Sequence, residues 1–232
     1  MYDALHTHLM EAARTADPKT VSRFFKTAPG TYGAHDRFLG LPIPFLRKAI
    51  KAFDGMTTHD VARLLESPYN EVRLCALLGL VEMYKQGGEA DKQALHAFYK
   101  DHMGRVNNWN LVDGSAPMLM GDPLLKGGEE LLVAYAKDQD LWVRRIGVVA
   151  TWRFIQMGRF DMTQRLCEML LDDGEDLMHK ACGWMLREMG KKDEATLLAF
   201  LDRFTPRMPR TMLRYALERL EPWVRARYMG VT

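Results

Sequence analysis

The feature that most constrains this chain of 232 residues is a recurring helical segment. It occurs three times, as EVRLCALLGLVEMYKQGG (71–88), DLWVRRIGVVATWRFIQMG (140–158) and DLMHKACGWMLREMGKK (176–192). Each copy places a basic residue shortly after an acid and then continues as an apolar run broken by glycine. No stretch alternates polar and apolar residues over the length of a strand, so the pattern predicts an all-helical chain.

The spacing between equivalent positions is 34 to 36 residues. Trp109 lies 36 residues from both Arg73 and Arg145, Lys180 follows Arg144 by 36, and Arg214 follows Lys180 by 34. A period of this length, built from paired helices, is typical of an α-solenoid of HEAT-like repeats. We therefore predict an all-α solenoid with a concave binding surface, formed by a single domain over residues 1–232.

Residues at one phase of such a repeat line the same face. We expect this face to carry Arg73, Trp109, Arg145, Lys180 and Arg214. An enclosed row of one charge sign attracts a polyanion. The alternative is that each basic residue only begins an inner helix.

Composition excludes several classes of protein. The chain is 47% hydrophobic and 27% charged, as in ordinary soluble proteins. It has no apolar window long enough for a membrane span, and its start lacks a signal-peptide pattern, so we expect a cytoplasmic protein. Three cysteines without a CxxC pair and seven histidines without ligand spacing predict neither a metal site nor another cofactor. The cysteines are expected to pack as small hydrophobic residues.

Charge is uneven along the chain. The net charge is +2, but residues 200–232 hold seven arginines against three acids. An arginine-rich end can bind phosphate through Arg207, Arg210 and Arg214, and the alternative is a solvated helix face.

Five segments together resemble one known family, the AlkD-like DNA alkylation repair family of monofunctional DNA glycosylases built from HEAT-like repeats. The similarity covers nearly the whole chain. It is carried by PGTYGAHDRFLGLPIPFLRK (29–48), RVNNWNLVDGSAPMLMG (105–121), LWVRRIGVVATWRFI (141–155), HKACGWMLRE (179–188) and MPRTMLRYALERL (208–220). The resemblance implies that the partner is duplex DNA containing alkylated purines, and we expect a monomer.

The resemblance also implies the site residues. Trp109 and Asp113 fall on the family's W-x-x-x-D element, and Trp184 falls on the Trp of its G-W-x-L-R-E helix, so these three are the expected catalytic residues. Arg145 matches an arginine that lies near the DNA backbone at the lesion. The full set of expected DNA-binding residues is Arg145, Arg144, Lys180, Arg73, Arg210 and Arg214.

This chain departs from the family's best-known branch at two places. Asn108 and Asn110 stand where that branch has a tryptophan and an acid. The tyrosine that contacts DNA near the N-terminus has no aligned counterpart, because Tyr32 is offset by one residue.

The chemistry of alkylpurine excision suits these residue types. An N3- or N7-alkylated purine is cationic and departs neutral without a general acid, so one carboxylate, Asp113, can stabilise the sugar cation and direct water. The electron-rich faces of Trp109 and Trp184 attract a sugar that becomes positive. We expect these three side chains to converge on the concave face. Pro117 lacks the N–H that would bond the carbonyl of Asp113, so the helix is predicted to kink there.

Other readings stay open at this point. The tryptophans at 109 and 184 could be core residues, and Asp113 could pair with an arginine of a neighbouring repeat. Trp142, Trp152 and Trp223 are expected to be packing residues. At the level of the molecule, the rivals are a non-catalytic HEAT-type adaptor for a protein partner and a protein that binds distorted DNA without excision. The resemblance implies a grip on sugar and backbone without a deep base pocket.

Overall fold

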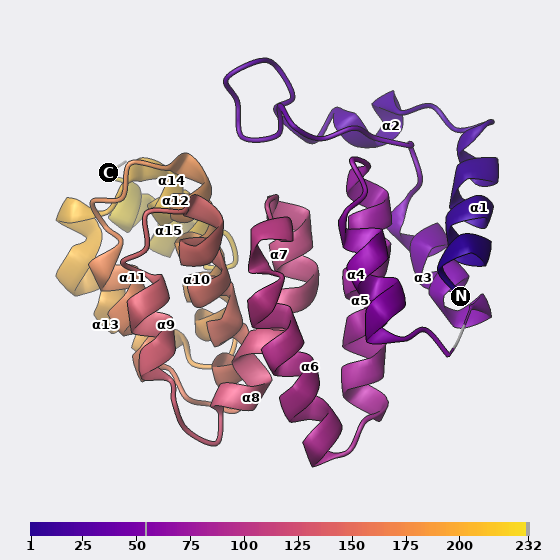
Figure 1. The fold of residues 1–232 in the computed structure, drawn as a ribbon. Helices are drawn as coiled ribbons and strands as arrows, with labels where there is room; N and C mark the ends of the chain where they lie inside the picture. The colour runs from indigo at the N-terminus through magenta and orange to yellow at the C-terminus, as the bar shows by residue number, and fades with distance from the viewer. Residues whose placement is uncertain (54, 231–232) are drawn as a thin grey trace. The chain divides into compact units, whose positions relative to one another are not determined.

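The regular elements of the chain are helices. The structure, a computed structural model, describes residues 1–53 and 55–230, and within these ranges it contains helices and loops together with one isolated β-bridge between Arg37 and Tyr69 (Figure 1). The predicted all-α class is confirmed. None of the described helices is long and apolar enough to cross a membrane.

The contacts of the chain divide it into two compact units. The first covers Met1–Ser115 and the second begins at Ala116. The sequence predicts a single domain over residues 1–232. Whether the two units act as one domain stays a prediction. We describe each unit by itself.

The first unit is built around one buried helix, α5 (Asn70–Gln86). Its apolar residues occur on all sides, as expected for a helix enclosed by others, and it packs against α3, α4 and α6. In Figure 1, α4 and α5 lie side by side. The other helices of this unit are α1 (Tyr2–Ala13), α2 (Lys19–Ser22), α3 (Ile43–Ala52), α4 (Thr58–Leu65), α6 (Glu89–Asp101), a 3₁₀ turn (Met103–Arg105) and α7 (Trp109–Ala116).

The second unit shows the predicted period directly. Helices α10 (Leu141–Gln156), α12 (Asp176–Gly190) and α14 (Arg210–Ala216) begin at positions 141, 176 and 210, and α12 packs against both of the others. The remaining elements are a π-helical segment (Pro117–Gly121), α8 (Asp122–Leu124), α9 (Glu130–Tyr135), α11 (Asp161–Met169), α13 (Glu194–Phe204), a 3₁₀ turn (Thr205–Arg207) and α15 (Pro222–Met229). The spacing of 34 to 36 residues is therefore a structural repeat in this unit.

Glycine makes the close approach of α12 and α14 possible. A Cβ atom on Gly183 of α12 would lie 2.5 Å from the carbonyl oxygen of Met212 and 2.6 Å from the Cβ of Tyr215. Any larger residue would push the two helices apart. The Gly that precedes Trp184 in the sequence is thus a packing requirement.

The helical pattern changes at Pro117, where the sequence predicts a kink. The α-helical pattern of α7 ends at Ala116, and the next five residues are π-helical. Proline cannot donate to the carbonyl four residues earlier, which is that of Asp113, so the regular ladder cannot continue through it.

Two expectations about packing have opposite outcomes. Cys75, Cys167 and Cys182 are buried and reduced, as predicted, and burial raises the pKa of Cys75 to about 12. Trp223 was expected to pack against the protein, but its side chain is on the surface with 71% exposure, so that expectation is wrong.

Candidate active site

Trp109 and Asp113 lie one turn apart on α7. Both are half-buried. Residues at i and i+4 of a helix share a face, so the structure presents the indole and the carboxylate on the same side of α7. This is the arrangement that the sequence predicts for these two residues.

A buried polar network fixes the start of α7. The side-chain amide of Asn108 donates to a carboxylate oxygen of Asp36, and the amide of Asn70 donates to the same oxygen at 3.0 Å. The amide of Asn110 donates to the Oδ1 of Asn70 at 2.6 Å. The two asparagines that flank Trp109 therefore have a structural role in this chain, which is to anchor α7 to α5 and to Asp36.

Arg73 belongs to this network and not to an exposed row. Its guanidinium pairs with the carboxylate of Asp36, donates to the carbonyl of Ser67 at 2.9 Å, and is 4% exposed. A carboxylate as buried as Asp36 requires such a partner. Arg73 is thus a partner of a buried acid and does not form an exposed row, and its predicted contact with the DNA backbone stays a prediction.

The indole of Trp109 is held by a second aromatic ring. Its ring stacks on Phe25 with the centroids 4.9 Å apart and the planes 18° from parallel, and Phe25 in turn contacts Phe38 at 4.7 Å. Such contacts restrict the orientation of the indole. Phe25 thus positions Trp109, a role that the sequence analysis missed.

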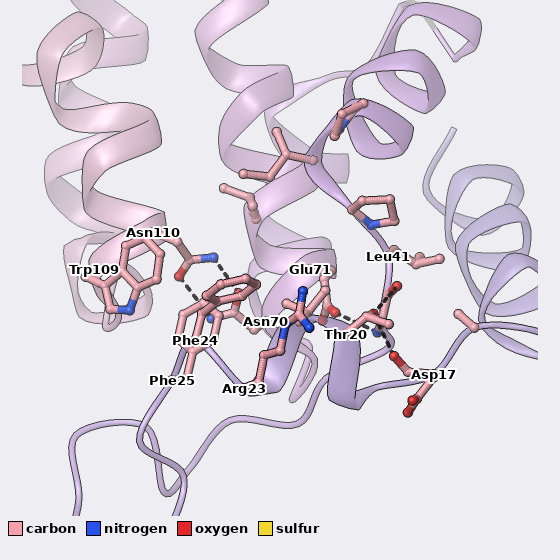
Figure 2. Close-up of a pocket in the computed structure, with 17 residues that line it drawn as sticks. Asp17, Thr20, Arg23, Phe24, Phe25, Leu41, Asn70, Glu71, Trp109 and Asn110 are labelled. Atoms are coloured by element: carbon pink, nitrogen blue, oxygen red, sulfur yellow. Dashed lines mark hydrogen bonds between the residues drawn. The ribbon is translucent and has the colours of Figure 1, made fainter.

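Trp109 also borders a cavity of about 640 Å³. Figure 2 shows the rings of Phe24, Phe25 and Trp109 together on one side of it and Asp17 and Thr20 on the other. Apolar side chains of α3 and α5 and the loop before α3 complete the lining, including Leu41, Ile43 and Leu74. The signal in the sequence was the pair Phe24–Phe25 between two basic residues, which carries no helical period and was not singled out.

The lining of the cavity includes a buried carboxylate, that of Glu71. It is 1% exposed and accepts hydrogen bonds from the backbone N–H of Leu39 at 3.0 Å and of Gly40 at 2.8 Å. Burial raises the pKa of Glu71, although these hydrogen bonds act in the opposite direction. The carboxylate holds the chain at residues 39 and 40 against α5.

Trp184 lies on α12 in the second unit. It is half-buried, and its indole N–H donates to the Oε1 of Glu188 at 3.2 Å. The same carboxylate oxygen accepts from the ammonium of Lys191 at 2.7 Å. The orientation of the indole is therefore set by Glu188, a residue of the same helix. Its predicted convergence with Trp109 and Asp113 stays a prediction.

The predicted basic residues of the second unit differ in exposure. Arg145 is 4% exposed and donates to the carbonyl of Leu177 at 2.6 Å, so it does not form an exposed row with the others, and its predicted contact with the DNA backbone stays a prediction. Arg144 pairs with Asp173 at 2.8 Å. Arg210 and Arg214 are exposed.

Lys180 pairs with Asp176, one turn before it on α12. The ammonium and carboxylate are 2.8 Å apart, and the hydroxyl of Thr211 donates to the same carboxylate at 2.7 Å. These partners hold the pKa of Asp176 below its ordinary value. The ion pair is partly exposed, and pairs of this kind contribute little to stability. The predicted contact of Lys180 with DNA stays a prediction.

Comparisons with known proteins concern the family and the fold of the chain. Residues 5–220 match the model of a protein family described as DNA alkylation repair enzyme. The fold is similar to that of a solved structure, a predicted DNA alkylation repair enzyme from Enterococcus faecalis, with a TM-score of 0.66 and 15% sequence identity over 89% of this chain and 97% of that chain. A comparison with curated protein sequences gives no match.

Proposed function

Because the chain belongs to the family of DNA alkylation repair enzymes, we propose that it is a monofunctional DNA glycosylase acting on duplex DNA. Its substrates are cationic purines alkylated at N3 or N7, and it hydrolyses their N-glycosidic bond. The observation that carries the proposal is the placement of Trp109 and Asp113 one turn apart on α7, both half-buried, with the start of the helix anchored by buried asparagines.

The reaction needs one carboxylate. The bond between C1′ and the ring nitrogen breaks, and its electron pair neutralises the cationic base, which leaves without protonation. Asp113 stabilises the positive charge that develops on the deoxyribose. A water molecule directed by Asp113 then adds to C1′ and releases one proton to the solvent, leaving an abasic site.

The indoles of Trp109 and Trp184 also stabilise the sugar cation. An aromatic face attracts a cation through its quadrupole, so Trp109 favours the oxocarbenium-like sugar over the neutral one. Phe25 supports this role because it stacks on the indole and restricts its motion. We propose that Trp184 contributes to the same reaction, with its indole oriented by Glu188.

Binding of the DNA backbone is proposed for the accessible basic residues of the second unit. These are Arg144, Lys180, Arg210 and Arg214, with Arg145 as a further contact. Arg144 pairs with Asp173 and Lys180 pairs with Asp176, and we propose that a DNA phosphate competes with these carboxylates. Such contacts fix the position of the protein on the duplex without reading its sequence.

The test is release of methylated bases from duplex DNA. The protein is incubated with N-methylated DNA, and free 3-methyladenine and 7-methylguanine are measured over time against spontaneous loss. Leucine at Trp109 or Trp184 should slow release, and duplexes with uracil should be poor substrates because uracil lacks the positive charge. Salt-dependent binding without any release would leave a protein that binds distorted DNA.

A further inference from the structure

The cavity beside Trp109 has no place in the mechanism above. The resemblance in sequence implies a grip on sugar and backbone alone, yet this chain has a space of about 640 Å³ bordered by Phe24, Phe25 and Trp109 (Figure 2). Pockets of about 300 to 1,000 Å³ are the usual size for small ligands. We call it the Phe24 pocket; its lining also includes Arg23, Asn70, Glu71 and Asn110.

The polar groups inside the Phe24 pocket already have protein partners. Asn70 and Asn110 hydrogen-bond to each other, and Asn70 also donates to Asp36. The carboxylate of Glu71 accepts hydrogen bonds from the N–H groups of Leu39 and Gly40. The pocket therefore offers aromatic and aliphatic surface, and few groups that could recognise a ligand by hydrogen bonds.

Phe24 is exposed where a phenylalanine would ordinarily be covered. Its side chain is 62% exposed, and the guanidinium of Arg23 lies 4.9 Å from the centre of its ring. Lys19 and Lys26 are also exposed on the same short segment. Exposed rings interleaved with cations are the combination that binds unpaired nucleic acid, in which bases stack on the rings and cations follow the phosphates.

We propose that the Phe24 pocket receives a nucleobase displaced from the duplex and holds it by stacking, without distinguishing which base it is. This inference rests on the proposed function, because it takes DNA as the substrate and Trp109 as a neighbour of the deoxyribose. A planar heterocycle fits the chemistry of the lining, and its polar edge can remain toward Arg23 and solvent. Enzymes that act on bases in duplexes commonly hold one base outside the stack.

The first experiment compares two duplexes that differ by one base. One carries a single extra adenosine, and the other carries a tetrahydrofuran abasic residue at the same place, so the backbone is equally distorted. Stacking of one base commonly contributes enough for roughly tenfold tighter binding, so the protein should bind the adenosine duplex about tenfold more tightly. Cytosine, guanine or thymine in place of adenine should give a similar gain.

Variants test whether the gain in affinity from the extra base depends on the Phe24 pocket. Phe24→Ala should abolish it, and Phe24→Tyr, which keeps a ring, should retain it. Trp223→Ala removes an exposed aromatic outside the pocket and should also retain it. Because Phe24 is largely exposed, circular dichroism should show that the variants at this position fold as the wild type does. Equal affinity of the wild type for the two duplexes, or an unchanged gain in Phe24→Ala, overturns the proposal.

Fluorescence gives a second readout. An extra 2-aminopurine should be quenched when the wild type binds, because it stacks on aromatic rings, and less so with Phe24→Ala. Brightening with the wild type would place the base in solvent and overturn the pocket. Measuring base release on methylated DNA in parallel separates the two claims: release without a base-dependent gain contradicts only the pocket, and a gain without release contradicts only the glycosylase.

Discussion

At the scale of single residues, the buried carboxylate of Asp36 gives Arg73, one of the predicted DNA contacts, a structural partner. Asp36 accepts hydrogen bonds from Asn70, Asn108 and Arg73. A basic residue that opens an apolar helix gives the same sequence signal whether it faces solvent or a buried acid. Arg73 was predicted to line the concave binding face, and its partner Asp36 lies 37 residues earlier in the chain, too far for periodicity to reveal it.

Removal of Arg73 should therefore destabilise the protein. We expect Arg73→Met to lower the free energy of unfolding by about 3 to 5 kcal/mol, because it leaves Asp36 buried without a cation. Urea unfolding measures this change, and the exposed Arg214→Met is the control, with an effect within about 0.5 kcal/mol. If Arg73→Met unfolds like the wild type but binds duplex DNA more weakly, Arg73 is a phosphate contact after all.

The contrast between near and distant residues in the sequence also determines how much of the site could be predicted. Trp109 and Asp113 share a helix face, and that relation is visible in five consecutive letters. The anchor of their helix is not, because Asn108 and Asp36 are 72 residues apart and meet only through the fold. Phe24 and Phe25 lie in a segment with no regular period. The sequence therefore shows that they are aromatic but does not predict where they lie in the fold.

At the scale of elements, α4 begins with a reciprocal cap. Thr57 accepts a hydrogen bond from the N–H of Asp60, while the carboxylate of Asp60 accepts from the backbone N–H of Thr57 at 3.0 Å, its hydroxyl at 2.7 Å and the N–H of Tyr2 at 2.8 Å. The hydrogen bond from the Thr57 side chain, followed by that from its backbone, holds the pKa of Asp60 well below its ordinary value. The carboxylate thus joins α1 to α4.

This cap predicts a pH dependence. The pKa of Asp60 is lower in the folded than in the unfolded protein, so its contribution is full above about pH 4 and is lost as the pH falls below that value. Asp60→Asn should lower the free energy of unfolding at pH 7 by about 1 kcal/mol, and the difference from wild type should shrink in acid. Asp3→Asn, at an exposed aspartate of the same unit, is the control. A difference that stays constant from pH 7 to pH 3 contradicts this account.

Packing between repeats gives the second prediction for elements. Gly183→Ala should destabilise the protein by about 1 to 3 kcal/mol, because the new methyl group meets the backbone of α14. Since Trp184 is the next residue, base release should also slow. Gly174→Ala is the matched control in the same unit, where a Cβ atom meets nothing within 4 Å. Thermal unfolding that is the same for both variants would show that α12 and α14 can separate without cost.

At the scale of the whole molecule, the repeat was the most predictable property. The period read from Arg144, Lys180 and Arg214 reappears as the starts of α10, α12 and α14. The exposure of individual residues was less predictable, as the buried Arg145 and the exposed Trp223 show. A period fixes which helix a residue occupies, whereas exposure depends on what the neighbouring elements place against it.

The basic residues that we propose to contact phosphates predict how DNA binding responds to salt. We expect sequence-independent binding to duplex DNA whose affinity falls by orders of magnitude between about 50 and 200 mM salt, because several phosphate contacts release counterions. Arg214→Ala should reduce the slope of log affinity against log salt by about one, and Arg165→Ala, an exposed arginine outside the proposed set, should leave it unchanged. Binding that is absent at low salt or insensitive to salt would favour an adaptor for a protein partner.

The central claim is that Asp113 stabilises a sugar cation, and one measurement tests it most directly. The rate of 3-methyladenine and 7-methylguanine release from methylated duplex DNA is compared for the wild type and Asp113→Asn, at saturating protein and against spontaneous loss. Asparagine keeps the shape of the side chain and removes its charge, so release should slow by about 10²- to 10³-fold, while DNA affinity stays equal or rises because a charge near the phosphates is gone. Release by Asp113→Asn at the wild-type rate would contradict the mechanism.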